Sequence, residues 1–330
     1  MRLGLALPFT QALPFPEYLA LAAQAEAAGY DTLWTGEING TDAVTTMTLL
    51  ASRTGRINVA SGIIPVQTRT PVVLGMTAAS LAQIAPGRIR LGLGVSSRII
   101  VSQWNGVPFE RPLEQLREAV QVIRLVLSGE RVNFEGRFYR IQNFRLAQPP
   151  PGRPVPIYLA ALGPRMLRLA GEIADGVLLN WIPPEAIPQS IREIEIGAKR
   201  AGRTLADLDI AAYIRTAVTD EPESARAGLA REITGYCIVD SYGKFFADCG
   251  FGSEVEAVNR AWGTGDRQGA VRQISPRFLD GLGVVGPADF CRRRLEEFAK
   301  AGLTQPVVFP FSPDPDPRPA LLCTLRAFAA

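Results

Sequence analysis

The stretch RTPVVLGMTAASLAQIAPGRIRLGLGVSS, residues 69–97, predicts a loop, a helix, a tight stop and a strand that ends in small polar residues. Pro71 suits the first helical position, where its missing N–H costs nothing, and Pro86 with Gly87 ends the helix. Apolar residues then alternate with an arginine and two glycines along a short strand. The helix over 72–85 carries no charged side chain, so we expect it to be covered on both sides.

The same alternation of strand and helix continues through most of the 330 residues. Strands are predicted at 2–9, 32–37, 57–64, 89–94, 157–161, 176–180, 210–218 and 306–311, and helices at 16–28, 42–53, 72–85, 113–127, 164–173, 185–201 and 287–301. About eight strands that alternate with helices are typical of a (β/α)8 TIM barrel of the α/β class. A doubly wound open sheet would need a glycine-rich phosphate turn after the first strand, and LALPFTQALPF has none.

We expect a single barrel domain over residues 1–330, with two insertions inside it. The first, over 130–155, has the pattern of a hairpin followed by a proline-rich return path. The second, over 219–286, combines helical patches with aromatic residues, and segments of this length within a compact domain are usually functional lids or extra helices.

The composition is that of an ordinary globular protein, with 47% hydrophobic and 20% charged residues. A net charge of +3 with scattered basic residues does not indicate nucleic acid or an anionic membrane as a partner. No apolar run approaches the roughly 20 residues that span a bilayer. The four cysteines lack CxxC spacing, so we expect neither a metal site nor disulfides, and we place the protein in the cytoplasm.

The chain contains no histidine, and this excludes several kinds of catalytic site. Ser-His-Asp and Cys-His nucleophilic catalysis, HExxH zinc hydrolysis and any imidazole base all need that side chain. Any acid or base must therefore be a carboxylate, Tyr, Lys, Cys or a cofactor.

In a TIM barrel the active site lies at the carboxyl ends of the strands. Here those ends are small and apolar, which suits a flat aromatic cofactor better than a hydrolytic or metal centre. Glu37 is the one carboxylate at a clear strand end, and it could relay a proton beside the cofactor or form a salt bridge at the rim.

The segment LAALGPRMLR, residues 159–168, is a candidate anion site. A glycine turn leads into a helix N-terminus, where free N–H groups attract anions, and Arg165 and Arg168 add positive charge. The alternative is an ordinary turn with Pro164 at the first helical position.

The sequence resembles the bacterial luciferase-like monooxygenase superfamily, and within it the branch that depends on the deazaflavin coenzyme F-420. The resemblance is carried by AAQAEAAGYDTLWTGE, TRTPVVLGMTAASLAQIAPGRIRLGLGVSS, PVPIYLAALGPRMLRLAGEIADGVLLNW and the hairpin GERVNFEGRFYR, in this order. It covers most of residues 1–215 and weakens after Val218. It implies a (β/α)8 barrel with a deazaflavin or flavin across the strand ends and hydride transfer at its ring.

The resemblance also implies which residues contact the cofactor. Ser61, Gly62 and Ile63 match a family bulge with a cis peptide bond, expected here at Gly62–Ile63, while Ala161 to Arg165 match the turn that contacts the phosphate-bearing tail. The predicted cofactor-binding residues are Ser61, Gly62, Ile63, Ser96, Ser97, Ala161, Leu162, Gly163, Pro164, Arg165 and Asn180. The helices 42–53 and 71–85, which are uncharged over 43–52 and 71–85, match the surface on which the family commonly forms homodimers.

Two departures from the family limit what the resemblance implies. Several members have an acidic residue followed by histidine where this chain has Glu37-Ile38, and no carboxylate lies near Ser97. We therefore expect an oxidoreductase that transfers a hydride between coenzyme F-420 and a small organic substrate of unknown identity. The alternatives are an FMN-dependent monooxygenase that uses reduced flavin and oxygen, and a non-catalytic flavin-binding barrel. A cofactor-free lyase or isomerase is disfavoured, because no lysine ends a strand and no carboxylates form a metal cage.

Overall fold

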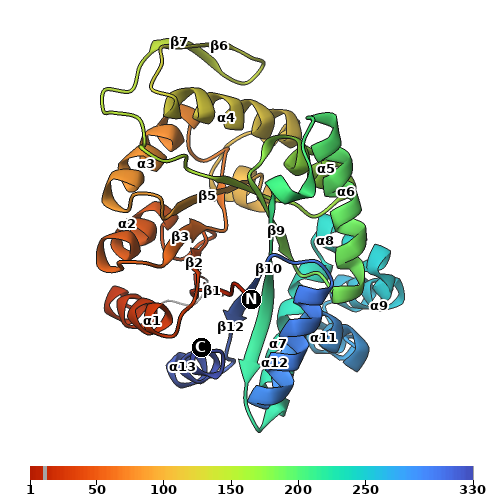
Figure 1. Cartoon of the computed structure of the whole chain (residues 1–330). Helices are drawn as coiled ribbons and strands as arrows, with labels where there is room; N and C mark the ends of the chain where they lie inside the picture. The colour runs from red at the N-terminus through yellow and green to blue at the C-terminus, as the bar shows by residue number, and fades with distance from the viewer. Residues whose placement is uncertain (10–12, 330) are drawn as a thin grey trace.

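The computed structural model describes residues 1–9 and 13–329, and its centre is a closed ring of parallel strands with helices around it (Figure 1). In ring order the described strands are β1 (Gly4–Ala6), β2 (Thr32–Thr35), β3 (Asn58–Ser61), β5 (Ile89–Gly94), β8 (Ile157–Ala160), β9 (Gly176–Asn180), β10 (Asp209–Val218) and β12 (Gln305–Pro310). The ring closes where β12 pairs with β1 and where β9 pairs with β10. The predicted (β/α)8 barrel is confirmed.

The helices form the outer layer, and each buries its apolar side against the ring. They are α1 (Phe15–Ala27), α2 (Ala43–Arg53), α3 (Pro71–Ile84), α4 (Pro112–Leu127), α5 (Pro164–Ile173), α6 (Ile187–Arg200), α12 (Ala288–Lys300) and α13 (Arg318–Ala327). In α4, for example, Pro112 opens the helix, and Leu116, Val120 and Ile123 form the buried stripe that its sequence predicts. No helix among the described residues is long and apolar enough to cross a bilayer.

Helix α3 is covered on one side only. It packs on α2 and α4, and at Gly75 an added Cβ would lie 2.6 Å from a methyl carbon of Val126. Val73, Met76 and Ile84 remain 43–47% exposed, so the cover expected on the second side is not supplied by the described part of this chain.

Two predicted strands differ from the structure, and the structure contains elements that were not predicted. The first strand is only β1, and the strand predicted over 57–64 is broken, since β3 ends at Ser61 and a short β4 (Ile64–Pro65) pairs instead with β5. The last four residues of the 219–286 segment form a strand, β11 (Gly283–Gly286), which pairs with β10. The segment after β5 contains a π-helical turn, η1 (Ile99–Trp104), that the sequence did not reveal.

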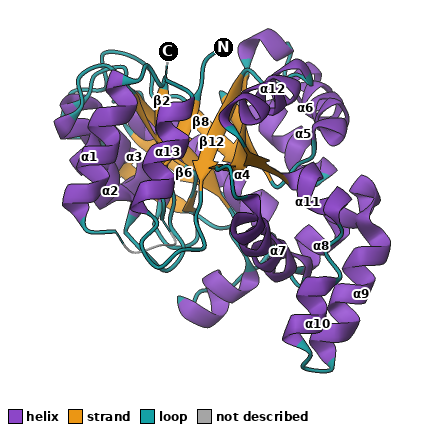
Figure 2. Cartoon of the chain, turned by 90° about the horizontal axis from the view of Figure 1, so that it is seen from below, coloured by secondary structure: helices purple, strands orange, loops and turns teal. Residues whose placement is uncertain are grey.

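The segment between β10 and β11 is a group of helices whose apolar core also includes Trp181, Ala217 and Phe311 of the barrel. It comprises α7 (Pro222–Cys237), α8 (Asp240–Phe246), α9 (Gly252–Gly263), α10 (Arg267–Arg272) and α11 (Pro276–Leu282). Figure 2 shows these helices gathered beside the barrel. Their core includes Phe251 and Phe278, whose rings stack with centroids 4.1 Å apart. The other insertion carries the antiparallel hairpin β6 (Val132–Glu135) and β7 (Arg140–Phe144).

The inside of the ring is filled by large side chains. Trp34, Tyr158, Tyr213 and Phe309 pack there, and the Trp34 indole N–H donates to Oε1 of Gln305 at 3.2 Å. Because this packing fills the interior, a ligand must bind at the strand ends rather than inside the ring.

Candidate active site at the strand ends

The break after β3 is held by one side-chain hydroxyl. Ser61 Oγ accepts the N–H of Gly92 at 2.8 Å and donates to the carbonyl oxygen of the same residue at 2.9 Å. These two bonds replace the backbone ladder between β3 and β5 where the chain bulges. A Cβ on Gly92 would lie 1.7 Å from the Ser61 carbonyl oxygen, so the position accepts only glycine.

The peptide bond between Gly62 and Ile63 is cis, and this prediction is confirmed. Tyr213 lies directly behind the bulge, with its hydroxyl donating to the Gly62 carbonyl oxygen at 3.1 Å. A Cβ on Gly62 would lie 2.0 Å from that hydroxyl oxygen. Burial raises the pKa of Tyr213, so its phenol stays protonated at all ordinary pH values.

Two polar side chains near the bulge are buried without a hydrogen-bond partner among the described residues. They are the Thr35 hydroxyl, which lies in register with Ser61 on the neighbouring strand, and the amide of Gln67, unpaired at both its oxygen and its nitrogen. Buried polar groups normally have partners, so such atoms point to a ligand or water that completes them. Sequence reasoning missed both residues, because a hydroxyl or an amide near a strand end gives no periodic signal.

The fourth-strand loop starts with Ser96 and Ser97, both partly buried at the carboxyl end of β5. Ser96 adopts a left-handed conformation with φ of 55°, which is uncommon for a side-chain-bearing residue. Ser97 Oγ accepts the N–H of Ile100 at 3.4 Å, and so fixes the start of η1. The β5 end therefore lies next to the bulge, since the Ile63 side chain lies 2.9 Å from where a Cβ on Gly94 would be.

The predicted anion turn forms the entrance to α5. Gly163 is the residue before the helix, it has no side chain to cap it, and Pro164 follows at the first helical position. Arg165 is exposed in the first turn and forms no ion pair among the described residues. Arg168, which the sequence also offered as an anion ligand, instead pairs with the mostly buried carboxylate of Glu193 on α6. The free charge at this turn is therefore that of Arg165.

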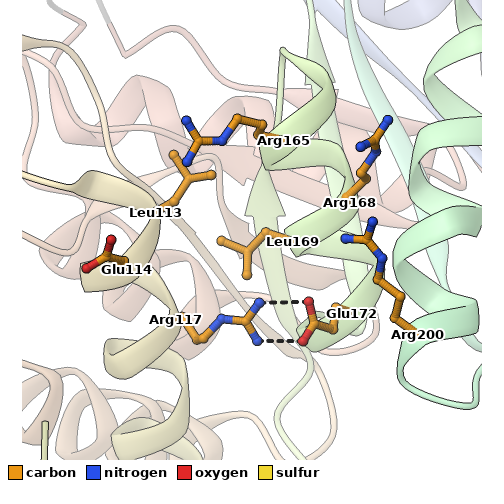
Figure 3. A pocket seen from close by; sticks show the side chains of 8 residues that line it. All are labelled: Leu113, Glu114, Arg117, Arg165, Arg168, Leu169, Glu172 and Arg200. Carbon is orange, nitrogen blue, oxygen red and sulfur yellow. Dashed lines mark hydrogen bonds and ion pairs between the residues drawn. The ribbon is translucent and has the colours of Figure 1, made fainter.

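A pocket of about 260 Å³ runs from this turn along the outside of the barrel between α4, α5 and α6 (Figure 3). Four of its lining side chains are arginines, and Arg117 is paired with Glu172 through two hydrogen bonds of 2.7 Å. The lining residues are Leu113, Glu114, Arg117, Arg165, Arg168, Leu169, Glu172 and Arg200.

Glu37 borders a second pocket, of about 360 Å³, at the ends of β2 and β4. One of its oxygens accepts from Arg69, and the other accepts the N–H of Ala43 at 3.0 Å, at the start of α2. Arg69 also pairs with Asp42, and its hydrogen bond with Glu37 raises the pKa of the guanidinium. Both carboxylate oxygens of Glu37 are thus engaged by the protein, and the partner, Arg69, was not singled out from the sequence.

Asn180, at the end of β9, links the barrel to the helical insertion. Its side-chain oxygen accepts from Arg215 on β10, and its nitrogen contacts the hydroxyl of Tyr242 on α8 at 2.9 Å. Of the eleven predicted cofactor-binding residues, those of the bulge and the β5 loop are brought together, while the α5 turn follows β8 and Asn180 ends β9, the next two strands of the ring. The two pockets share no lining residue.

Comparison with known proteins gives matches over most of the chain. A family model described as luciferase-like monooxygenase matches residues 1–305. The 5,10-methylenetetrahydromethanopterin reductase of Archaeoglobus fulgidus is 29% identical over 297 residues, which are 88% of either chain. A Mycobacterium tuberculosis protein, assigned as a coenzyme F-420-dependent oxidoreductase, is 31% identical and covers 93% of this chain and 94% of its own.

Solved structures agree with these matches. The coenzyme F-420-dependent tetrahydromethanopterin reductase of Methanopyrus kandleri superimposes with a TM-score of 0.84 at 28% identity, over 100% of this chain and 98% of that chain. An F-420-dependent secondary alcohol dehydrogenase reaches a TM-score of 0.80 at 20% identity, which shows the shared fold alone.

Proposed function

The chain belongs to the luciferase-like monooxygenase family, and from this premise we propose that it is an oxidoreductase that transfers a hydride between coenzyme F-420 and a small organic substrate. The observation that carries the proposal is the similarity to F-420-dependent reductases, which extends over nearly the whole chain. The pterin substrates named for those relatives are not part of the proposal.

The residues at the strand ends fit a flat ring with an anionic tail. The bulge from Ser61 to Ile63 would support the ring, and the unpaired Thr35 hydroxyl and Gln67 amide offer polar contacts beside it. Arg165, at the start of α5, would hold the phosphate of the tail. The loop at Ser96 and Ser97, the turn from Ala161 to Pro164 and Asn180 complete the proposed set.

When bound, the deazaflavin supplies the hydride chemistry, and the protein supplies binding, orientation and exclusion of water. Tyr213 holds the bulge from behind and keeps its proton, because burial raises its pKa. Glu37 uses both oxygens to hold Arg69 and the start of α2, so we assign it the role of a positioning residue at the rim. A substrate whose reduction needs no acid from the protein fits this arrangement best.

The test is a fluorescence titration of the purified protein with coenzyme F-420 and, separately, with FMN. We expect micromolar binding of the deazaflavin and much weaker binding of FMN. Tight binding of FMN instead would favour the flavin-dependent monooxygenase, and binding without turnover of any substrate would favour the non-catalytic barrel. Binding of neither would refute the proposal.

The same titration tests the tail site with two arginine variants. We expect Arg165→Ala to weaken deazaflavin binding by roughly fivefold, which corresponds to about 1 kcal/mol for an exposed charge at a helix N-terminus. Arg293→Ala, at an arginine of α12 that is likewise exposed and lies outside both pockets, is the matched control and should leave the affinity unchanged. Equal effects of the two variants would place the phosphate elsewhere.

We also propose that the protein forms homodimers through α2 and α3. The exposed Val73, Met76 and Ile84 form an apolar stripe on α3, and no charged residue occurs between Asp42 and Arg53 on α2. Contiguous exposed apolar surface of this kind marks an interaction site. Light scattering should report a dimer that Ile84→Lys dissociates, while Ile196→Lys, at a similarly exposed isoleucine on α6, should leave the dimer intact.

A further inference from the structure

A buried guanidinium lies at the mouth of the barrel, close to the bulge. Arg215 follows Tyr213 by two residues on β10, so both side chains point to the same side of the strand, toward the inside of the ring. Tyr213 touches the bulge at Gly62, and Arg215 lies further toward the carboxyl end of the strand, in register with Phe309 on β12. Its side chain is only 6% exposed.

Aromatic rings surround this charge. The guanidinium carbon lies 3.9 Å from the centre of the Trp181 ring and 4.4 Å from that of Phe309. Tyr236 of α7 lies further out, at 6.0 Å, and packs on Trp181. Such contacts compensate part of the cost of burying a cation, but they leave its N–H groups without acceptors.

The polar partners of Arg215 are few. Nη1 donates to the side-chain oxygen of Asn180. Glu232 of α7, which is 44% exposed, forms an ion pair with Arg215, but the 3.6 Å from Nε to its carboxylate oxygen is too long for a hydrogen bond. Nε is therefore buried without a hydrogen-bond partner among the described residues.

A second unpaired donor lies in the same cluster. The indole N–H of Trp181 is buried and has no acceptor among the described residues, although the ring packs directly on the guanidinium. Trp181 also adopts a left-handed conformation with φ of 53°, which a bulky residue keeps only where its surroundings demand it. Buried N–H donors are ordinarily hydrogen-bonded, so two such donors without acceptors in one cluster indicate a missing acceptor.

We propose that Arg215 and Trp181 form the docking site for a carboxylate of the substrate. A carboxylate has the charge and the paired oxygens that a guanidinium binds best, and its second oxygen can accept from the indole N–H. The aromatic rings around the pair favour an unsaturated or apolar body attached to that carboxylate. The inference rests on the proposed function, because that function places the reacting atoms over the bulge next to this site.

The test uses two-dimensional NMR of the ¹⁵N-labelled protein, with and without bound coenzyme F-420. The side-chain N–H signals of Arg215 and Trp181 are assigned by their loss in Arg215→Met and Trp181→Phe. The probes are acetate, which fits any carboxylate site, and acetamide, its neutral counterpart of the same shape. Both are added up to about 50 mM, where millimolar binding saturates.

We expect acetate to shift both signals along a saturating curve, and acetamide to shift neither. In Arg215→Met, the Trp181 signal should lose its response, with the acetate Kd raised at least about tenfold for the loss of a charge-assisted bond. Arg215→Lys should keep part of the response. The Arg267 and Trp262 pair, whose cation and ring lie 3.7 Å apart on the insertion, is the internal control and should stay unshifted.

Other outcomes overturn the inference. No response to acetate, or equal responses to acetate and acetamide, would show that Arg215 only fastens the insertion to the barrel through Asn180 and the aromatic rings. The proposed function fails separately, through the absence of deazaflavin binding by the unmodified protein, so the two failures are told apart.

Discussion

Ser61→Ala is the substitution whose effect the structure specifies most closely. The hydroxyl is fully buried, and it is both acceptor and donor for the backbone of Gly92, at 2.8 and 2.9 Å. Its removal leaves one N–H and one C=O of a buried strand without partners. Each orphaned group costs about 1–3 kcal/mol, so we expect a loss of roughly 2–6 kcal/mol in the free energy of unfolding.

Thr35 provides the matched control for this loss. Its hydroxyl lies on the adjacent strand, in register with Ser61, and is equally buried, but it has no partner among the described residues. Thr35→Val removes that hydroxyl with little change in shape. We therefore expect Thr35→Val to leave stability unchanged or to raise it, since an unsatisfied buried oxygen disappears.

Urea unfolding followed by circular dichroism measures both variants, with free energies extrapolated linearly to water. The predicted loss is a large fraction of the roughly 5–15 kcal/mol that a domain typically has, so Ser61→Ala should unfold at a clearly lower urea concentration. A loss below about 1 kcal/mol for Ser61→Ala, or equal losses for the two variants, would refute the claim that the two hydrogen bonds of Ser61 stabilise the bulge.

Three further predictions concern the bulge, the rim and the base of the barrel. Gly62→Ala places a Cβ 2.0 Å from the Tyr213 hydroxyl oxygen, so deazaflavin binding should weaken at least about tenfold. Adding Tyr213→Phe to this variant should restore part of the affinity. Additive effects of the two substitutions in a titration would contradict the coupling between residues 62 and 213. Glu37→Gln weakens the ion pair with Arg69 but keeps an acceptor for the N–H at the start of α2, so the free energy of unfolding should fall by less than about 1 kcal/mol, and Glu37→Ala should cost more. If turnover in Glu37→Gln is instead lost while cofactor affinity is unchanged, Glu37 is a proton donor. Burial opposes ionisation of Asp209, but hydrogen bonds from neighbouring side chains outweigh burial and hold the pKa of its carboxyl below the usual range. The stabilising effect of this carboxylate is therefore full above the ordinary aspartate pKa and is lost as the pH falls through the lowered value. Acid unfolding should be less steep in Asp209→Asn, and unchanged steepness would exclude this group as a source of the acid sensitivity.

The ring of strands could be predicted because its signal is local. Alternation of apolar residues along a strand, and prolines or glycines at helix ends, depend on neighbours in the sequence, and α5 and β9 have the bounds that these signals predict. The strand predicted over 57–64 was too long because the same local signal does not stop where the strand ends. Its apolar residues continue past Ser61, and only the contact with Gly92 on another strand shows where the chain leaves the ladder.

The parts that sequence reasoning missed depend on contacts between distant residues. Tyr213 donates a hydrogen bond to Gly62, which lies 151 residues earlier in the sequence, and nothing in the residues around Tyr213 reveals that contact. Arg215 lies in a mostly apolar strand, and its sequence neighbours do not show that it is buried. Its position between Trp181 and Phe309 follows only from the packing of β9, β10 and β12 next to one another. Strand β11 was missed because GVVG is short and follows a long helical segment.

The core of the helical insertion between β10 and β11 also includes Trp181, Ala217 and Phe311 of the barrel, while the supports of the bulge, Ser61, Gly92 and Tyr213, all belong to the ring. Substitutions within the insertion that keep its contacts with these barrel residues should therefore leave the strands that carry the bulge undisturbed. Exchange of this module between family members would then test whether the insertion selects the substrate while the bulge stays intact.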